Sequence, residues 1–472
     1  MLFSLWPKLL KSIPERLQDA RLVGRSRFYV GAVLGCVIAA GAAHAETLRA
    51  GFAQIDVSTR AQIPMGGYGT FFLKTPRLNT AGIHDPLFVG ALVLESPEGE
   101  LAALASVDAV GFSGVQVSRI EAKIREALNP KIHFILSATH THHSPDTLGL
   151  WGSLPRSGRN VRYSEQLEAA IVQAVQEAFA ARVPVKVTQK VGRHANDSTA
   201  AEAWAPEDLQ DQFISLSFYS EALGALVGTF TQWSAHPTVL GMENNALSAD
   251  YVGAFREAMS RRWAVPHLYF NGAIGKVNPL VPAADDPELS DDLFPAGDKD
   301  PDVKDHYRRV STVGDRLAQS VLNTEEQRLA LNYSKFGSFS MCHVPVAFPV
   351  DNFLFKTASQ LRVVETRIKS GKIRSRVSSL GVGPLVFVSI PGELFPKVLK
   401  KIPPQALTGR KPIWLGMGQD WLGYFVDQAD YQNPKLKYWT DLSVHKEASN
   451  LLLEGMSKAV SGQGCVEWTD ED

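Results

Sequence analysis

Three histidines fall within four residues, in the segment Ser137-Ala-Thr-His-Thr-His-His-Ser-Pro-Asp146. This segment directly follows the apolar run Ile132-His-Phe-Ile-Leu136, which is typical of a strand. Because residues two apart in a strand point the same way, His140 and His142 would share a face. Two neutral imidazoles at a strand end suit a first-row metal ion, with one as ligand and the other as base. The alternative is that these histidines are ordinary polar residues of a loop.

Four further candidate residues also follow apolar, strand-like runs. His236 follows the run 226–233, Glu393 follows 384–390, and both Tyr424 and Tyr438 come after 411–415. Binding and catalytic residues lie preferentially on loops at one edge of a strand scaffold. Taken singly, each has a structural alternative. His236 would cap a strand before its proline, the tyrosines would belong to the core, and Glu393 would be stabilised by the dipole of a following helix over 394–400.

The elements that would position these residues alternate between strand-like and helix-like segments. The pattern predicts an α/β fold: a mixed β-sheet body flanked by helices, in a single large catalytic domain over residues 46–472, with the metal site on loops at strand ends. We expect strands at 92–95, 101–107 and 267–270, a hairpin over 213–219 and 225–233, and helices around 117–128, 167–175 and 251–259. Ser164 is the expected N-cap of the second helix.

Residues 1–45 have the layout of a secretory signal peptide. A basic start precedes an apolar run over 28–43, and Ala43-His-Ala45 supplies small residues for cleavage. An uncleaved anchor is the alternative, but the run holds sixteen residues, three of them glycine, whereas a spanning helix needs about 20. Val33-Leu-Gly-Cys36 loosely resembles a lipoprotein cleavage box, although the apolar run continues past it. We therefore expect a periplasmic or secreted protein, assuming a bacterial source.

Charge and cysteine content narrow the function classes. Without the six Lys/Arg and two Asp/Glu of the leader, the net charge changes from −1 to −5, and no basic stripe indicates nucleic acid as a partner. Two cysteines remain, Cys342 and Cys465. They would either form a disulfide that ties down the C-terminus or stay as free buried thiols. Because no Cys-x-x-Cys occurs, a metal site must consist mainly of His and carboxylates.

An acidic stretch over 285–305 contains eight aspartates and one glutamate with almost no apolar periodicity. Such runs are typical of solvated surface loops. A calcium site or a mobile flap over the active centre are the alternatives.

Several spaced segments resemble the N-terminal catalytic region of the neutral/alkaline, non-lysosomal ceramidase family. They occur in the order of the family and extend over nearly the whole chain after the leader. The segments are Ala50-Gly-Phe-Ala-Gln-Ile-Asp56, Pro64-Met-Gly-Gly-Tyr68, His84-Asp-Pro-Leu87, Ser137-Ala-Thr-His-Thr-His142, Ala235-His-Pro-Thr238, Ile390-Pro-Gly-Glu393 and Gly423-Tyr424.

The resemblance implies a zinc ion (Zn2+) held by two His, one Glu and one Tyr. Matched by motif, these ligands are His140, His236, Glu393 and Tyr424. His142 corresponds to the catalytic base, and Tyr438 matches a catalytic tyrosine that contacts the reacting carbonyl. On a strand, His143 would face away from His140 and His142, so we expect it behind the ligands or at the surface.

The sequence also departs from the family pattern. Asp197 lies where the family has an arginine that lines the active site, and Arg193 is a candidate to replace it. Lys276 lies where an aspartate is usual, and His142-His-Ser-Pro-Asp146 replaces a more glycine-rich continuation. The smaller β-sandwich domain usual in ceramidases does not follow before Asp472. These departures concern substrate recognition rather than the zinc ligands.

Together these features predict an exported zinc-dependent amidohydrolase that cleaves the N-acyl bond of ceramide or a related N-acyl lipid. The products would be a fatty acid and a sphingosine-type amine. Its partner would be a lipid-like small molecule, with transient contact to a membrane surface, no nucleic acid and no obligate protein partner. One alternative is a zinc hydrolase of a different amide, ester or lactone. The other is a catalytically idle periplasmic binding protein on the same scaffold.

Overall fold

The computed structural model describes residues 47–69, 75–153, 155–198, 210–280, 303–331 and 338–468, without the side chains of 196–198 and 303–305. These residues belong to a unit that begins at His44. The leader expected at 1–45 lies outside them. So does the acidic stretch 285–305, apart from its last three residues, which begin a helix. Within the described ranges, no helix has both the length and the apolar character needed to cross a bilayer.

The largest sheet contains nine strands among the described residues. Neighbours are antiparallel except for the parallel pairs β3–β4 and β8–β9. In spatial order the strands are β4 (His133–Ala138), β3 (Leu101–Val107), β2 (Phe88–Glu95), β1 (Arg49–Asp56), β5 (Val183–Arg193), β7 (Gln212–Ser220), β8 (Leu226–Trp233) and β9 (His267–Asn271), with β11 (Gln327–Arg328) beside β5.

A second sheet is formed by the C-terminal third of the chain. Its order is β12 (Ser340–Pro349), β14 (Lys372–Val382), β15 (Leu385–Ser389) and β17 (Lys411–Leu415), with β13 (Ile368–Lys369) beside β14. The pair β15–β17 is parallel. Two short ladders complete the pairing: β6 (Asn196–Ser198) with β10 (Val277–Pro279), and β16 (Glu393–Leu394) with β18 (Tyr424–Phe425).

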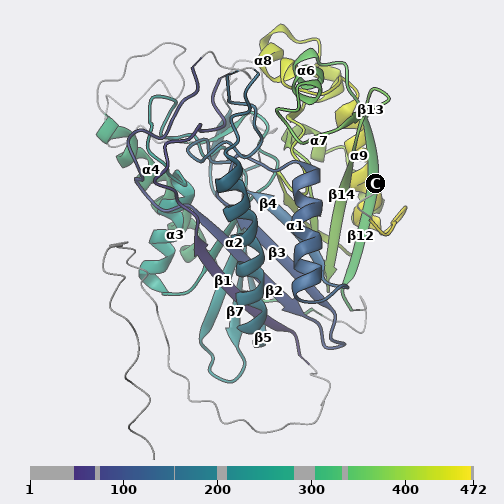
Figure 1. The fold of residues 1–472 in the computed structure, drawn as a ribbon. Coiled ribbons are helices and arrows are strands. Elements are labelled where there is room, and N and C mark those ends of the chain that lie inside the picture. Colours follow the sequence, from purple (N-terminus) through teal and green to yellow (C-terminus); the bar gives the residue numbers. More distant parts are fainter. Residues whose placement is uncertain are drawn as a thin grey trace, which may run out of the picture. The chain divides into compact units, whose positions relative to one another are not determined.

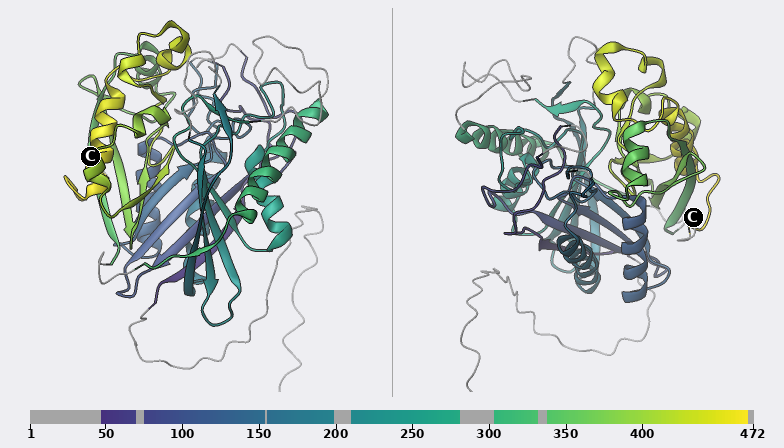
Figure 2. Two further views of the ribbon diagram at one scale, coloured as in Figure 1. Left: turned by 180° about the vertical axis from the view of Figure 1, so that it is seen from behind. Right: turned by 45° about the horizontal axis from the view of Figure 1, so that its top comes forward.

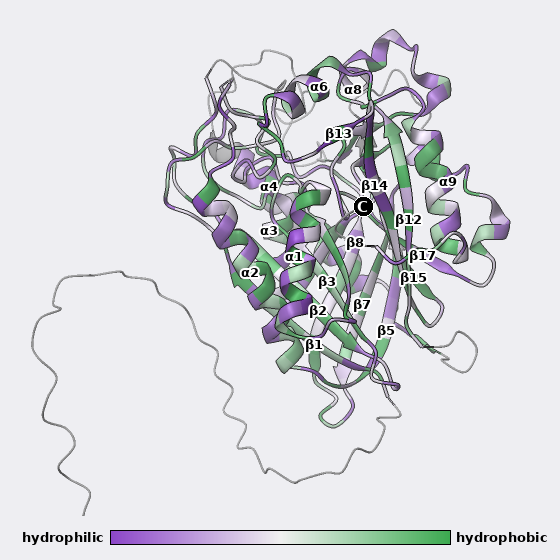
Figure 3. Cartoon of the chain, turned by 45° about the vertical axis from the view of Figure 1, so that its right-hand side comes forward, coloured by the Kyte–Doolittle hydropathy of each residue, from purple (hydrophilic) through white to green (hydrophobic). Residues whose placement is uncertain are grey.

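Helices cover the outer faces of the sheets. Helices α1 (Gly114–Ala127) and α2 (Val161–Ala180) lie in front of β1, β2 and β3 (Figure 1). Helices α3 (Tyr251–Arg262) and α4 (Val303–Asn323) pack on each other and against β9 and β5, on the side away from the yellow C-terminal helices (Figure 2). Helix α9 (Ala448–Ser461) covers β12 and β14. Hydrophilic and hydrophobic residues both occur along α1, α2 and α9 (Figure 3), as expected for helices with one buried face.

The core between the sheets explains why the strands are apolar on both faces. Phe230 stacks on Phe270 at 4.6 Å and meets the edge of Phe387 from the second sheet at 5.3 Å. Leu92 and Leu104 belong to the same inner cluster, whereas the neighbouring alternate residues of β2 and β3 pack outward under the helices. A strand that is covered on both sides becomes a nearly continuous hydrophobic run.

The predicted α/β fold class, with a mixed β-sheet body and flanking helices, is confirmed. The expected strands, hairpin and three helices are present, with shifted bounds. Ser164 is not an N-cap, because α2 begins three residues earlier and the side chain of Asn160 accepts the hydrogen bond from the Tyr163 amide. The helix expected over 394–400 is only α7 (Pro396–Leu399), and Glu393 lies in β16 instead of at its first turn. Among the described residues, the other α-helices are α6 (Phe353–Gln360) and α8 (Lys437–Asp441).

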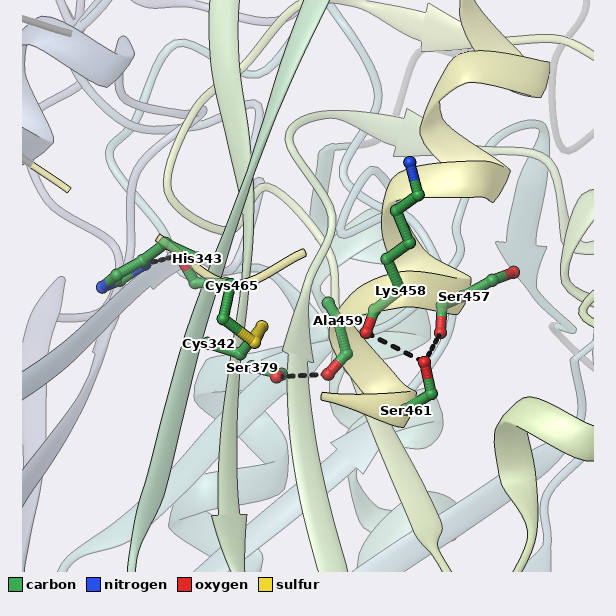
Figure 4. The surroundings of a disulfide bond; sticks show 9 residues. Cys342, His343, Ser379, Ser457, Lys458, Ala459, Ser461 and Cys465 are labelled. Carbon is green, nitrogen blue, oxygen red and sulfur yellow. Dashed lines mark hydrogen bonds between the residues drawn. A yellow bond between two sulfur atoms is a disulfide. The ribbon is translucent and has the colours of Figure 1, made fainter. Parts of the chain in front are cut away.

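Cys342 and Cys465 form a disulfide (Figure 4). Cys342 lies in β12, and Cys465 follows α9, so the bond joins the segment after this helix to the strand that the helix covers. Next to it, the amide of Val466 donates to the carbonyl oxygen of His343 at 3.0 Å. The structure thereby decides between the two alternatives for these cysteines in favour of the disulfide.

Candidate metal centre

The candidate residues meet where the strands of three parallel pairs end. His140 follows β4, His236 follows β8, and Glu393 follows β15. The carboxyl ends of parallel strands lie at one edge of a sheet, where ligands usually bind. Asn271, at the end of β9, connects these loops: its Nδ2 donates to the carbonyl oxygen of Thr139, and its own carbonyl oxygen accepts from the Gly416 amide at 2.8 Å.

Two imidazoles have their Nδ1 atoms bonded to backbone carbonyl oxygens. His140 Nδ1 donates to the Val110 oxygen at 2.5 Å, and His236 Nδ1 donates to the Val277 oxygen at 2.9 Å. These bonds assign the ring proton to Nδ1 and leave Nε2 with a free lone pair. Histidine ligands of metal ions generally show this arrangement, because the outer hydrogen bond sets the tautomer and the ring orientation.

The free ring nitrogens converge on the carboxylate of Glu393. Its Oε2 lies 2.9 Å from His236 Nε2 and 3.3 Å from His140 Nε2, and His142 Nε2 lies 3.2 Å from His140 Nε2. In a tetrahedral site with bonds of about 2.0–2.1 Å, neighbouring ligand atoms lie about 3.3 Å apart. All four side chains are buried, so acceptor atoms this close to one another need a shared proton or a cation between them. The residues therefore fit a metal ion.

Electrostatics support an anionic carboxylate at this point. Burial disfavours the charge of Glu393, but its interactions with His140 and His236 outweigh burial and hold the pKa of the carboxyl well below its ordinary value. Trp421 Nε1 donates to the other carboxylate oxygen, Oε1, at 3.1 Å. Glu393 thus brings a buried negative charge to the point where the ring nitrogens converge. These contacts, and not the dipole of a following helix, stabilise its charge.

His142 meets His140 for a different reason than predicted. Strand β4 ends at Ala138, and His140 has a left-handed backbone with φ of 68°. The loop therefore turns the two rings together, and strand alternation plays no part. The His142 ring packs against Gly67, where an added Cβ would lie 2.2 Å from its Cγ. The backbone oxygen of His142 accepts a hydrogen bond from Arg77.

His143 is fully buried, so the surface alternative for this residue is wrong. Its Nε2 donates to the Gly241 carbonyl oxygen at 2.9 Å, and its ring meets that of Tyr68 at 5.4 Å. Tyr68 also contacts the His142 ring, edge to face, at 4.7 Å. His143 therefore lies behind the converging rings of His140 and His142, as the other expectation placed it.

The two tyrosines lie on the remaining side of the site. Tyr424 pairs with Glu393 in the β16–β18 ladder, and burial together with the negative charge of Glu393 raises the pKa of its hydroxyl well above the ordinary value. The ring of Tyr438, in α8, lies 6.3 Å from that of Tyr424. Burial and the charge of Glu393 raise the pKa of Tyr438 to about 12. Both hydroxyls therefore keep their protons at neutral pH in the absence of a nearby cation.

A small hollow adjoins the site, with about 10 Å³ open to a water-sized molecule. Sequence analysis did not identify several of the residues that line it, among them Trp151 and Trp421. The signal for Trp421 was its place two residues before Gly423-Tyr424, and the signal for Gly67 was its place in the quoted Pro64–Tyr68 segment. The lining residues are Gly67, Gly69, His140, His142, Trp151, Glu393, Trp421, Tyr424, Tyr438 and Leu442.

Asp197 and Lys276 depart from the ceramidase pattern, and Arg193 is the candidate replacement for the missing arginine. These three residues lie in different environments. Arg193 cannot replace the missing arginine, because its side chain is 78% exposed and pairs with Asp211 at 2.9 Å. Asp197 lies in β6 opposite Asn278 of β10, outside the described side chains. Lys276 is buried with φ of 60°, immediately before Val277, whose carbonyl oxygen accepts both the amide and the Nδ1 hydrogen bond of His236.

No protein-family model matches the sequence, and comparison with curated proteins finds no significant match. Solved structures do match. Neutral ceramidase from Pseudomonas aeruginosa superimposes with a TM-score of 0.68 at 15% identity, over 89% of this chain and 75% of that one. This chain has the neutral ceramidase fold. A structure described as ceramidase complexed with C2 agrees, with a TM-score of 0.69 at 14% identity over 90% of this chain and 77% of the other. The predicted resemblance to neutral ceramidase is confirmed as a likeness of fold, and the roles of individual residues stay predictions.

Proposed function

We propose that this protein is a zinc-dependent amidohydrolase that cleaves the N-acyl bond of ceramide or a related N-acyl lipid. The observation that carries the proposal is the convergence of His140, His236 and Glu393 in a buried site on the neutral ceramidase fold. Two solved structures with this fold are described as ceramidases. Fold alone does not set a reaction, so the proposal depends on the site.

The donor atoms fit zinc. His140, His236, Glu393 and Tyr424 would hold the ion through two imidazole nitrogens, a carboxylate and a phenol oxygen. Zinc commonly takes nitrogen and oxygen ligands of this kind in catalytic sites. When bound, it supplies Lewis acidity and makes water available as a nucleophile near neutral pH.

His142 and Tyr438 would carry out the proton transfer and the oxyanion stabilisation. Burial lowers the pKa of His142 well below its ordinary value, and its interactions with His140 and His236 act in the same direction. Its ring is therefore neutral at pH 7 and able to take a proton from water, then deliver it to the leaving amine. Tyr438, whose pKa is raised to about 12, keeps its O–H and donates to the oxygen that becomes negative as the amide carbonyl is attacked.

The walls of the hollow favour a lipid substrate over a polar one. Trp151, Trp421, Tyr438 and Leu442 present mostly apolar surface beside the metal-binding side chains. Lipid recognition needs such surface, with a few polar groups placed to orient the reacting amide. Tyr438 is 45% exposed, and Phe353 of α6 is 76% exposed. These exposed aromatic side chains support transient contact with a membrane surface.

Export through the leader over 1–45 is part of the proposal. The disulfide between Cys342 and Cys465 supports a periplasmic or secreted location, because disulfides persist mainly in oxidising compartments.

A hydrolysis screen tests the proposal. Fluorescent ceramides, N-acyl amino acids and lactones are incubated with purified protein, with and without a zinc chelator. We expect about one zinc per chain, release of fatty acid from ceramide, and loss of that activity with chelator. Hydrolysis of only another amide, an ester or a lactone would assign the zinc chemistry to a different substrate. Fully active, metal-free protein would overturn the mechanism, and a protein with neither zinc nor activity would be an idle binding relative.

A further inference from the structure

The two carboxylate oxygens of Glu393 have different partners. Oε2 lies 2.9 Å from His236 Nε2 and 3.3 Å from His140 Nε2, on the side where the ring nitrogens converge. Oε1 accepts a hydrogen bond from Trp421 Nε1 at 3.1 Å. Trp421 is 5% exposed, so water does not readily replace this donor.

The Trp421 indole has a fixed place beside the histidine loop. Its ring packs on Gly111, where an added Cβ would lie 3.1 Å from the Trp421 Cβ and Cγ. Gly111 directly follows Val110, whose carbonyl oxygen accepts the Nδ1 hydrogen bond of His140. The Trp421 ring also stacks with the ring of Phe355 at 6.3 Å. One side chain therefore contacts both the carboxylate and the backbone that orients an imidazole.

Asp420 holds the backbone of this tryptophan. Its Oδ1 accepts from the amides of Trp421 at 2.8 Å and Gly114 at 2.7 Å, and its Oδ2 accepts from the Ser375 hydroxyl at 2.7 Å. Gly114 begins α1, and Ser375 lies in β14. The indole is thereby attached to two elements that are far apart in sequence, so it presents its N–H to Glu393 from a rigid base.

From this geometry we infer that Trp421 is a positioning residue of the metal centre, which holds Glu393 Oε1 away from the ion so that Oε2 alone acts as a ligand. This inference rests on the proposed function, since it assumes that the site binds zinc. Hydrogen bonds to the outer atoms of ligands fix their orientation, and their removal typically weakens metal affinity about 10–100-fold. Without the N–H, the carboxylate is free to rotate and both oxygens compete for the same position.

The test is the zinc dissociation constant of Trp421→Phe, measured by competition with a chromophoric chelator. This change keeps an aromatic ring against Gly111 and Phe355 but removes the N–H. We expect zinc to bind about 10–100-fold more weakly, and the visible absorption of cobalt-substituted protein to change as the carboxylate changes its binding mode. Trp263→Phe is the matched control, because Trp263 lies at the end of α3 and does not line this hollow. Its zinc dissociation constant should equal that of the wild type.

Two further measurements separate the possible outcomes. Thermal unfolding of the metal-free variant shows whether it folds. If it does not, replacing Trp421 by benzothienylalanine, which substitutes sulfur for the N–H in a ring of nearly the same shape, repeats the test. Unchanged zinc affinity and an unchanged cobalt spectrum in the folded variant would overturn the role of Trp421 while leaving the proposed function intact. Wild-type protein that binds no zinc at all would overturn both.

Discussion

At the scale of single residues, His142 is the side chain on which the proposed chemistry depends most. Its Nε2 lies 3.2 Å from His140 Nε2, a separation that also suits two ligands of one ion. Gly67 and Tyr68 pack against the ring and hold it in this place. Distance alone therefore does not distinguish a base beside the ion from a third histidine ligand.

Substitution of His142 by Ala distinguishes the two roles. If His142 is the base, the variant keeps about one zinc per chain while turnover falls by about 10²–10⁴-fold, the usual contribution of a positioned base. Zinc content by elemental analysis and the rate of ceramide hydrolysis are the measurements. His236→Ala is the control and should lose the metal. Loss of zinc from the His142 variant as well would make His142 a ligand.

At the scale of elements, the side chain of Asn352 joins α6 to α8. Asn352 Oδ1 caps α6 by accepting from the amides of Leu354 at 2.8 Å and Phe355 at 3.3 Å. Its Nδ2 donates to the carbonyl oxygens of Asp441 at 2.7 Å and Ser443 at 2.8 Å. Asp441 ends α8, the helix that carries Tyr438. The cap thus couples the position of α6 to that of a proposed catalytic residue.

Two variants separate the contribution of Asn352 as the cap of α6 from its contribution to the position of α8. Asn352→Ala removes both and should lower the free energy of unfolding by about 1–2 kcal/mol, with a loss in kcat/KM as α8 becomes less well held. Asn352→Asp keeps a good cap but lacks the two amide donors, so we expect most of the stability to return and the activity to stay low. Thermal unfolding and hydrolysis kinetics measure both effects. Full activity in the Asp variant would contradict the proposed link between α6 and α8.

At the scale of the whole molecule, acid stability depends on a histidine far from the site. His343 is buried on β12 next to the disulfide (Figure 4). Burial, and then the positive charge of Arg376, lower its pKa to about 2, whereas the unfolded chain has a value of about 6.5. The folded protein therefore keeps this imidazole neutral. The resulting contribution to stability is complete above pH 6.5 and is lost progressively as the pH falls towards 2, because the unfolded state binds the extra proton.

Replacing His343 by Gln should flatten this pH dependence. Between pH 7 and pH 5 the wild type should lose about 2 kcal/mol more unfolding free energy than the variant, from the difference between the two pKa values. Denaturant unfolding at a series of pH values provides the measurement. Ser378→Ala, which removes the hydroxyl that His343 Nδ1 contacts at 2.8 Å, should keep the acid sensitivity because the imidazole remains. Parallel pH curves for wild type and His343→Gln would contradict the assignment.

Local patterns in the sequence were sufficient to predict the element types. Whether a strand is an alternating or a continuous apolar run depends on which of its faces are buried. These patterns correctly predicted the hairpin over 213–233 and the strand before the histidines. Helix starts were less certain: Asn160 and Ser164 are both good capping residues, and only the packing of α2 selects the first. Likewise, the strand pattern predicted that His143 faces away, but not that Gly241 and Tyr68 would bury it.

The sequence by itself, through its resemblance to the neutral ceramidase family, determined which residues are the candidate metal ligands. Tertiary structure decided how they meet. His140, His236 and Glu393 are separated by up to 253 residues, and their distances depend on three parallel strand pairs that end at one place. The left-handed turn at His140, the outward side chain of Arg193 and the indole bond to Glu393 all follow from contacts between segments distant in the chain. Such contacts leave no periodic signal in the sequence, so only the folded protein reveals them.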